Sequence, residues 1–255
     1  MSNQKQQTST RQTREAQHFD QLADSTGEIW WGSVTPAGIR RLERRVVYVQ
    51  DALAQFHNPT VLELGCGTGA FTKPLLQTIP QLRLTGVDVS PKTIEVIRKY
   101  FQENLQARFE VGDVSATMFA DNTFDAVIGN SVLHHVPLKE TLHESLRILK
   151  PGGVLWFSEP NMFNPQIAVE KNVRFVGKWL QNSEDETAFF RWPLARLLRG
   201  IGFQDISVQP FDFVHPGIPK QFVKAAESIN KVFEHAPLVR EIAGSLKVFA
   251  RKAIV

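Results

Sequence analysis

The sequence predicts an α/β fold in which helices cover both faces of a mostly parallel sheet. Short apolar runs alternate with amphipathic helical segments through residues 60–160. The first apolar run leads into three glycines at alternate positions, Gly65, Gly67 and Gly69, as a buried strand does when it enters a tight turn. Other runs end in acidic residues such as Asp88, and the carboxyl ends of parallel strands are where open α/β sheets bind ligands.

The composition bounds the class of protein. The chain has 255 residues, 42% hydrophobic and 22% charged, which suits one large domain, expected at 13–255. The net charge of +3 is too small to call for a nucleic-acid or membrane partner. Cys66 is the only cysteine, and no apolar run reaches a membrane-spanning length, so a cytoplasmic location is expected. Residues 1–12 are polar, lack the apolar core of a signal peptide, and are expected to form a disordered tail.

The N-terminal part is expected to form a helical cap over residues 13–57. A short helix is predicted at 13–23, followed by a loop at 29–32 that contains two adjacent tryptophans. Pro36 suits the start of a long helix, through which apolar residues recur at helical spacing. Four arginines near its start are interpreted as a solvated face, with anion binding as the alternative: Arg40, Arg41, Arg44 and Arg45.

The core, residues 58–160, is expected to contain five strands with helices between them. The strands are predicted at 61–64, 82–88, 107–111, 124–129 and 154–158. Pro74 lies within the helix expected at 70–79, so that helix should start at Pro74 or just before it. Ser90 and Pro91 are the N-cap and first-turn proline of the next helix. A further helix is predicted at 138–149, before a turn at 150–153.

The alternation breaks after residue 160. No strand is predicted at 161–191, which is interpreted as an insertion with a helix over 169–180. A second insertion is expected at 215–243. Long irregular connections in compact domains are often functional lids, so both insertions are expected to cover the acceptor. The remaining elements are a helix at 192–201, a strand at 203–213 and a last strand at 246–250.

The glycine stretch fits two classes of cofactor. Its glycines allow a sharp turn and a close approach of the ligand, and the helix that follows adds N–H donors. Gly65-x-Gly67-x-x-Ala70 matches the dinucleotide fingerprint. Gly65-x-Gly67-x-Gly69, with Glu63 upstream, resembles motif I of the class I S-adenosylmethionine-dependent methyltransferases. This stretch alone does not decide between the two.

Four further motifs follow in the order of that methyltransferase family. They are Gly-Val-Asp-Val-Ser at 86–90, Gly-Asp-Val at 112–114, Phe-Asp-Ala-Val-Ile with Leu-His-His-Val within 124–136, and Leu-Lys-Pro-Gly-Gly at 149–153. On these motifs the chain is identified as a member of the family, similar to its small-molecule types 11 and 25. The resemblance covers residues 56–159 closely. It implies a Rossmann-like, seven-stranded sheet with an antiparallel last strand, S-adenosylmethionine as cofactor and S-adenosylhomocysteine as product.

The resemblance also implies roles for the residues that match these motifs. Glu63 would complement the ammonium group of the cofactor's methionine part, and Asp88 would accept hydrogen bonds from two ribose hydroxyls. Asp113 would accept from the adenine amino group, while the backbone N–H of Val114 donates to the ring. No metal is expected. The full set of expected cofactor residues is Glu63, Gly65, Gly67, Gly69, Asp88, Val89, Asp113, Val114 and Asn130.

Catalysis of methyl transfer mainly requires alignment of the acceptor and exclusion of water. A base is needed only if the acceptor must lose a proton. His135 is the first candidate and His134 the second, although this pair could also serve only for packing or hydrogen bonding. Glu159 and His215, which end later strands, are further candidates.

The acceptor is expected to be a small molecule, apolar or sugar-like. The Asn-Pro-Pro-aromatic and Pro-Cys signatures of DNA methylation are absent, so no nucleic-acid partner is expected, and no membrane span. Clustered aromatic residues could wall the acceptor pocket: Trp30, Trp31, Phe189, Phe190, Trp192, Phe211 and Phe213.

Three alternative functions stay open at this stage. A methyltransferase acting on protein or RNA is weakly favoured by the arginines. A non-catalytic protein that binds S-adenosylmethionine would carry the same acidic residues. An NAD-dependent oxidoreductase would explain the glycines and Asp88, but neither Asp113 nor the turn at 150–153.

Overall fold

A computed structural model describes residues 13–20, 33–173 and 187–254 of the chain, and the statements below concern these residues. The expected tail at 1–12 and the tryptophan loop at 29–32 lie outside them. Residues 13–20 are helical, within the short helix predicted at 13–23.

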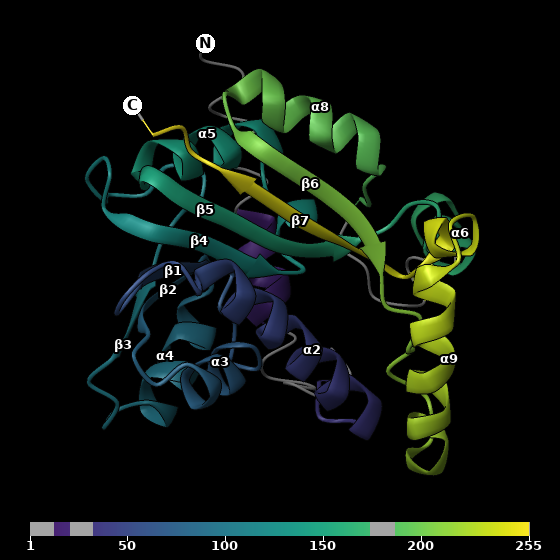
Figure 1. The fold of residues 1–255 in the computed structure, drawn as a ribbon. Coiled ribbons are helices and arrows are strands. Elements are labelled where there is room, and N and C mark those ends of the chain that lie inside the picture. Colours follow the sequence, from purple (N-terminus) through teal and green to yellow (C-terminus); the bar gives the residue numbers. More distant parts are fainter. Residues whose placement is uncertain (1–12, 21–32, 174–186, 255) are drawn as a thin grey trace.

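The centre of the molecule is a seven-stranded sheet with the strand order β3-β2-β1-β4-β5-β7-β6 (Figure 1). Strands β1 to β5 are parallel where they pair, whereas β7 runs antiparallel to both β5 and β6. This confirms the mostly parallel sheet and the antiparallel last strand. The strands are β1 Thr60–Leu64, β2 Arg83–Asp88, β3 Ala107–Val111, β4 Phe124–Asn130, β5 Leu149–Pro160, β6 Gln204–Phe211 and β7 Ser245–Arg251.

Helices cover both faces of this sheet, as the alternating pattern predicted (Figure 1). Helices α2, α3 and α4 pack on one face, and α5 and α8 on the other. Successive strand residues face opposite cores: Val61 packs with α2 and α3, while Leu62 packs with α5 and α8. The helices are α2 Pro36–Leu53, α3 Thr72–Thr78, α4 Pro91–Tyr100, α5 Leu138–Ile148, α6 Pro165–Asn172, α8 Arg191–Ile201 and α9 Val223–His235.

Capping residues account for where several helices begin. The Ser90 hydroxyl accepts a hydrogen bond from the Thr93 N–H, and Pro91 opens α4 as predicted. Thr35 caps α2 in the same way, directly before Pro36. Helix α6 begins at Pro165, four residues before the helix expected at 169–180, because the Asn164 side chain accepts from two backbone N–H groups of the first turn. The end of that expected helix lies outside the described residues.

The two expected insertions contain helices and a contact between them. The first carries α6 and an isolated bridge from Asn161 to Phe189. The second carries α9 between two short 3-10 helices, η3 Lys220–Phe222 and η4 Val239–Ile242. The Asn161 amide donates to the carbonyls of Glu241 and Ala243, both at 2.8 Å, so the start of the first insertion is tied to the end of the second.

The turn expected at 150–153 lies within β5, where pairing with β4 shifts register and Gly152 adopts a φ of +75°. The described part of the chain has no helix long and apolar enough to cross a membrane.

Candidate functional site

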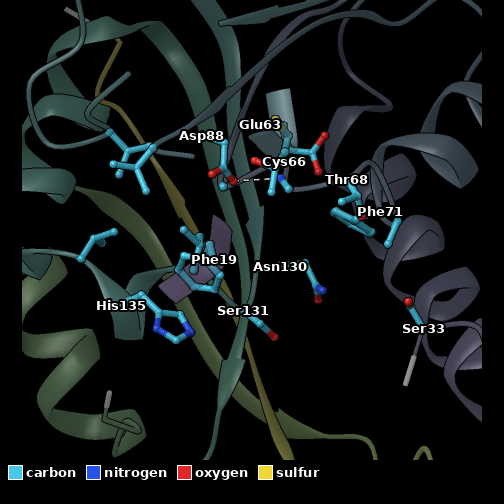
Figure 2. Close-up of a pocket in the computed structure, with 18 of the residues that line it drawn as sticks. Phe19, Ser33, Glu63, Cys66, Thr68, Phe71, Asp88, Asn130, Ser131 and His135 are labelled. Carbon is cyan, nitrogen blue, oxygen red and sulfur yellow. Dashed lines mark hydrogen bonds between the residues drawn. The ribbon is translucent and has the colours of Figure 1, made fainter. Parts of the chain in front are cut away.

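A cavity of about 250 Å³ opens at the carboxyl ends of the parallel strands (Figure 2). It lies where β1 and β4 are neighbours and their connections leave in opposite directions, which is the usual ligand position in open α/β sheets. The loops after β1, β2, β3 and β4 supply most of its lining. Helix α2 with Ser33 before it, the helical residues 13–20 and Pro216 of the second insertion supply the rest.

The loop after β1 contains the expected glycines in left-handed backbone conformations. Gly65 has a φ of +64°, and a Cβ at this position would lie 2.6 Å from a methyl carbon of Val132. Gly67 has a φ of +50° with open space where a side chain would be, and it lines the cavity. Gly69 packs against Ile97 instead and does not line the cavity. The first two glycines therefore bring backbone to the cavity wall, and the third allows packing.

Glu63 is a buried carboxylate at the end of β1, with 2% of its surface exposed. Its one hydrogen-bond partner among the described residues is the neutral Thr72 hydroxyl, at 2.7 Å. Burial, opposed by the Thr72 hydrogen bond and assisted by the nearby Asp88, raises the pKa of Glu63 to about 8. An acid placed in this way favours a cationic ligand group, because that cation would replace the lost hydration.

Asp88 ends β2 and faces the glycine loop. Its carboxylate accepts hydrogen bonds from the backbone N–H groups of Gly67 and Ser90, both at 2.9 Å. Burial raises its pKa, although these two bonds oppose the shift. Val89, the next residue, also lines the cavity. Asp88 thus joins the loops after β1 and β2 on one side of the site (Figure 2).

Asp113 follows β3 and caps its own turn while it lines the cavity. One carboxylate oxygen accepts from the Ser115 N–H at 2.8 Å and from the Ser115 hydroxyl at 2.7 Å. Val114 is buried and lines the cavity beside it.

The end of β4 brings Asn130 to the cavity (Figure 2). Its side-chain oxygen is buried and, among the described residues, has no hydrogen-bond partner. An orphaned acceptor of this kind is costly, so it marks a place where a ligand donor would be stabilised.

The His-His pair is held in two different environments by the short helix η2 Leu133–His135. Glu159 accepts from the backbone N–H groups of Val132 and Leu133, at 3.0 and 2.8 Å, and lies 2.6 Å from His134 Nδ1. Neither Glu159 nor His134 lines the cavity, whereas His135 does. Glu159 therefore positions η2, and burial raises the pKa of this carboxyl to about 7, against the hydrogen bonds from Leu133 and Val132.

His135 faces the N-terminal helical residues 13–20. Its Nδ1 lies 3.3 Å from a carboxylate oxygen of Glu15, and the Phe19 ring meets it edge-on at a centroid distance of 5.2 Å. Both Glu15 and Phe19 line the cavity. The sequence interpretation predicted a helix here but did not identify these residues. Their spacing of four, which places them on one helical face, was the available signal.

The arginines of α2 differ from the expected solvated face. Arg40 is exposed, as expected, but Arg45 is buried, with 4% of its surface exposed, and Arg41 and Arg44 are half-buried. Arg45 donates to the hydroxyls of Ser158 and Ser245 at 2.9 and 3.0 Å. The prediction is wrong here because α2 crosses the ends of β5 and β7, which helical periodicity alone does not reveal. Arg41 and Arg45 both line the cavity.

The expected aromatic wall is not found among the described residues. Phe189 and Phe211 are buried in packing elsewhere, Phe213 meets the Phe233 ring edge-on, and Phe190 and Trp192 are exposed. Trp30 and Trp31 lie outside the described residues. The aromatic side chains that do line the cavity are Phe19 and Phe71. His215 is exposed and does not line it.

The residues of this cavity fit S-adenosylmethionine better than a dinucleotide. A buried acid beside the glycine loop, Glu63, offers no counter-charge to a pyrophosphate but can pair with the ammonium group of a methionine. Asp88 and Asp113 add hydrogen-bond acceptors for hydroxyl and amino groups. In the described residues, no group of three or more His, Cys, Asp or Glu side chains is arranged to hold a metal.

Comparison with known proteins gives a consistent picture. The family model described as a methyltransferase domain matches residues 61–153. An uncharacterized methyltransferase-like protein of Schizosaccharomyces pombe is 31% identical over 65% of this chain and 62% of its own length. The ubiquinone biosynthesis O-methyltransferase of Actinobacillus pleuropneumoniae is 27% identical over 79% of this chain and 87% of its own. Among curated relatives that match over shorter stretches, the chain spans 46% and 32% of the relative's length.

Solved structures show the same fold. A crystal structure of an S-adenosylmethionine-dependent methyltransferase from Thermotoga maritima superposes with a TM-score of 0.61, at 19% identity, over 93% of this chain and 99% of that one. At this identity the likeness concerns the fold alone.

Proposed function

Because the chain belongs to the class I S-adenosylmethionine-dependent methyltransferases, a family of enzymes, we propose that it transfers a methyl group from this cofactor to a small organic acceptor. The observation that carries the proposal is one continuous cavity that joins the expected cofactor residues Glu63, Asp88 and Asn130 to His135 after β4. When bound, the cofactor supplies an electrophilic methyl group. The protein then has to bind and orient the acceptor and to exclude water from the site.

The acidic residues are proposed to hold the cofactor. Glu63 binds the ammonium group, Asp88 accepts from the ribose hydroxyls, and Asp113 with the Val114 N–H binds the adenine. Val89 and the glycines of the β1 loop complete the walls. The burial of Glu63 supports its role, since an ammonium group would restore the ionised state that burial disfavours.

His135 is proposed as the general base for an acceptor that must lose a proton. A carboxylate oxygen of Glu15 lies 3.3 Å from its Nδ1 without forming a hydrogen bond, and a negative charge on this side favours a proton on Nδ1, which leaves Nε2 to take a proton from the acceptor. His134 is assigned a positioning role, because its Nδ1 is engaged with Glu159 and it does not line the cavity.

A small acceptor is favoured over protein or RNA by the enclosure of the cavity. The helical residues 13–20 contribute Glu15 and Phe19 to its wall, so an extended macromolecular substrate would have to displace them. A relative named for ubiquinone biosynthesis supports a small aromatic or quinol-like acceptor. The division into a cap at 13–57, a core at 58–160 and insertions at 161–191 and 215–243 that cover the acceptor is part of this proposal.

The proposal is tested by methyl transfer with isotopically labelled cofactor. The purified protein is incubated with S-adenosylmethionine labelled in the methyl group, a panel of catechols, hydroquinones, aromatic carboxylates and amines, and a small-molecule cell extract. Mass spectrometry should detect one labelled methyl group on an acceptor, and at a cofactor concentration below saturation the signal should fall with Asp88→Ala. Tight binding of S-adenosylhomocysteine with no transfer to any acceptor would favour a non-catalytic protein, and binding of NADH alone would favour an oxidoreductase.

A further inference from the structure

Two arginines of α2 line the cavity on the half of the sheet that the cofactor residues do not use. The guanidinium of Arg45 contacts Ser158 of β5, Ser245 of β7 and, at 2.9 Å, the carboxylate of Asp212 after β6. The sheet order places β5, β7 and β6 beyond β4, while the cofactor acids follow β1, β2 and β3. Arg41, one helical turn before Arg45, lies beside it. The arginines therefore belong to the acceptor side of the site.

The hydrogen-bonding capacity of the two guanidinium groups is used very differently. Arg45 has partners on all three nitrogens: Ser158, the Arg41 carbonyl with Asp212, and Ser245. Arg41 donates through Nε to Asp212 at 2.8 Å, and its two terminal nitrogens have no hydrogen-bond partner in the described part of the chain. Two terminal N–H groups side by side are the arrangement that binds a carboxylate or phosphate through paired hydrogen bonds.

The charges of Arg41, Arg45 and Asp212 do not balance. Burial alone would raise the pKa of Asp212, but Arg45 and Arg41 hold it below its ordinary value, so Asp212 contributes one negative charge. Burial lowers the pKa of Arg45 to about 10, which still leaves it protonated at neutral pH. Arg44 forms its shorter ion pair with Glu234, at 2.8 Å, and lies 3.7 Å from Asp212. Two cationic residues in the cavity wall thus face one anion, which leaves one positive charge in a partly buried site.

The carboxylate that holds both arginines is itself in an uncommon backbone conformation. Asp212 has a φ of +75°, in the left-handed region that residues other than glycine rarely adopt, and 1% of its side chain is exposed. The Glu234 carboxylate accepts from its N–H and the Gly244 N–H donates to its carbonyl, which secures this conformation. Asp212 therefore fixes the Arg41 guanidinium through Nε and orients its free edge.

We propose that Arg41 binds a carboxylate or phosphate group of the methyl acceptor, so that the acceptor is an anionic small molecule whose anion is anchored on the β5-β7-β6 half of the cavity. The inference rests on the proposed methyltransferase function. Asp212 and Arg45 act as positioning residues, because they hold Arg41 and are themselves fully engaged. The chemistry is that of paired hydrogen bonds to an oxyanion in a partly buried site.

The test compares anionic and neutral probes of one size on the protein saturated with S-adenosylhomocysteine. The probes are benzoate, phenyl phosphate and the neutral benzamide, with affinities from saturation-transfer NMR. Wild type should bind at least one of the anions about tenfold more tightly than benzamide. In Arg41→Gln the affinity for that anion should fall to the affinity for benzamide. In Arg41→Lys the affinity for the anion should be intermediate. The matched control is Arg40→Gln, an exposed arginine on the same helix, which should behave as wild type.

Calorimetry with S-adenosylhomocysteine on each variant separates this proposal from the function on which it rests. Unchanged affinity for the product in Arg41→Gln, with the preference for anions lost, supports an acceptor subsite. Loss of product affinity in Arg41→Gln, with the preference for anions kept, would assign the guanidinium to the cofactor's carboxylate and overturn the proposal. Equal binding of all three probes to wild type would also overturn it.

If wild type binds no product, the methyltransferase function fails, and the probes on the cofactor-free protein still decide whether the anion site exists. If Arg41→Gln does not fold, Arg41→Lys decides.

Discussion

At the scale of single residues, the site depends on acids whose burial makes them sensitive to a ligand. Glu63 has a neutral partner and a pKa of about 8, so at neutral pH most of the ligand-free protein carries it protonated. An ammonium group placed against it would favour the ionised carboxylate. Binding of the cofactor and loss of a proton are therefore coupled.

We accordingly predict that S-adenosylhomocysteine binding at pH 7 releases a proton from wild type. Calorimetry in buffers of different ionisation enthalpy should report a release approaching about one proton per site, falling as the pH rises past 8. Glu63→Gln should abolish this release. A release that is unchanged in Glu63→Gln would mean that another group supplies the proton.

The same shift in pKa predicts how stability depends on pH. Because the folded pKa of Glu63 is raised above the unfolded value of 4.5, the folded state holds more protons than the unfolded state between pH 4.5 and about 8. The contribution of Glu63 to stability is thus fully present below pH 4.5 and declines as the pH rises through that window. Urea unfolding of the ligand-free protein should show a weaker decline in Glu63→Gln than in wild type. Equal slopes in the two proteins would contradict the assigned pKa.

Asp88→Ala should weaken S-adenosylhomocysteine binding by more than about tenfold, since hydrogen bonds to a charged group contribute on the order of 1.5–3 kcal/mol. The substitution also removes the acceptor for the Gly67 N–H, which shapes the glycine loop. Calorimetry on the folded variant measures the effect. Unchanged affinity would place the ribose elsewhere in the cavity.

His135→Ala should lower kcat by roughly 10²–10⁴ for an acceptor that loses a proton, the usual contribution of a general base. Affinity for S-adenosylhomocysteine should stay the same. The matched control is His143→Ala, an exposed histidine on α5. A full rate in His135→Ala would assign proton removal to solvent or to the acceptor itself.

At the scale of elements, the site is assembled from loops on one edge of the sheet, with α2 and the insertions around them. Asn161 bonds two carbonyls at the end of the second insertion, and the Asn164 amide donates to the Ile242 carbonyl at 2.9 Å. The two insertions are therefore mechanically coupled at their bases. Pro216 of the second insertion lines the cavity, whereas no described residue of the first does.

Replacing residues 165–187 with a short linker, while keeping Asn161 and Asn164, should preserve cofactor affinity and abolish turnover. The reason is that the cofactor residues lie on the loops after β1 to β4, apart from the first insertion, whose expected role is to cover the acceptor. Calorimetry measures the cofactor affinity, and the labelled-methyl assay measures turnover. A folded variant that loses the cofactor, or that keeps full activity, would remove the first insertion from the acceptor site.

At the scale of the whole molecule, the ligand should stabilise the fold, because the cavity is lined from the N-terminal helix, α2, four strand loops and the second insertion. At a hundredfold excess over Kd, S-adenosylhomocysteine should add about 2.7 kcal/mol. For a chain of this size the rise in Tm should be roughly 5–10 °C. Differential scanning fluorimetry with NADH as the comparison checks this, and a rise with NADH alone would contradict the cofactor assignment.

Much of this molecule could be predicted from its sequence because the determining signals are local. The glycine loop, the acid after each strand and the Ser90-Pro91 cap depend on backbone conformations and alternation that neighbouring residues set. These signals were sufficient to predict the sheet and the acids that line the cavity. The antiparallel last strand was predicted through the family resemblance. Strand ends and the start of α6 were displaced by a few residues, since pairing and capping decide them.

The acceptor side was decided only by the tertiary structure. Arg41 and Arg45 have the spacing of a solvated helical face, but the end of β6, more than 160 positions later in the chain, supplies the Asp212 that draws them into the cavity wall. Likewise Glu15 reaches His135 from the far end of the chain, and those aromatic residues expected in the pocket that the structure describes lie outside its lining. Local sequence determines which residues can form a strand, turn or cap. Which charges become buried together depends on contacts between distant segments, and no periodicity within one segment records these.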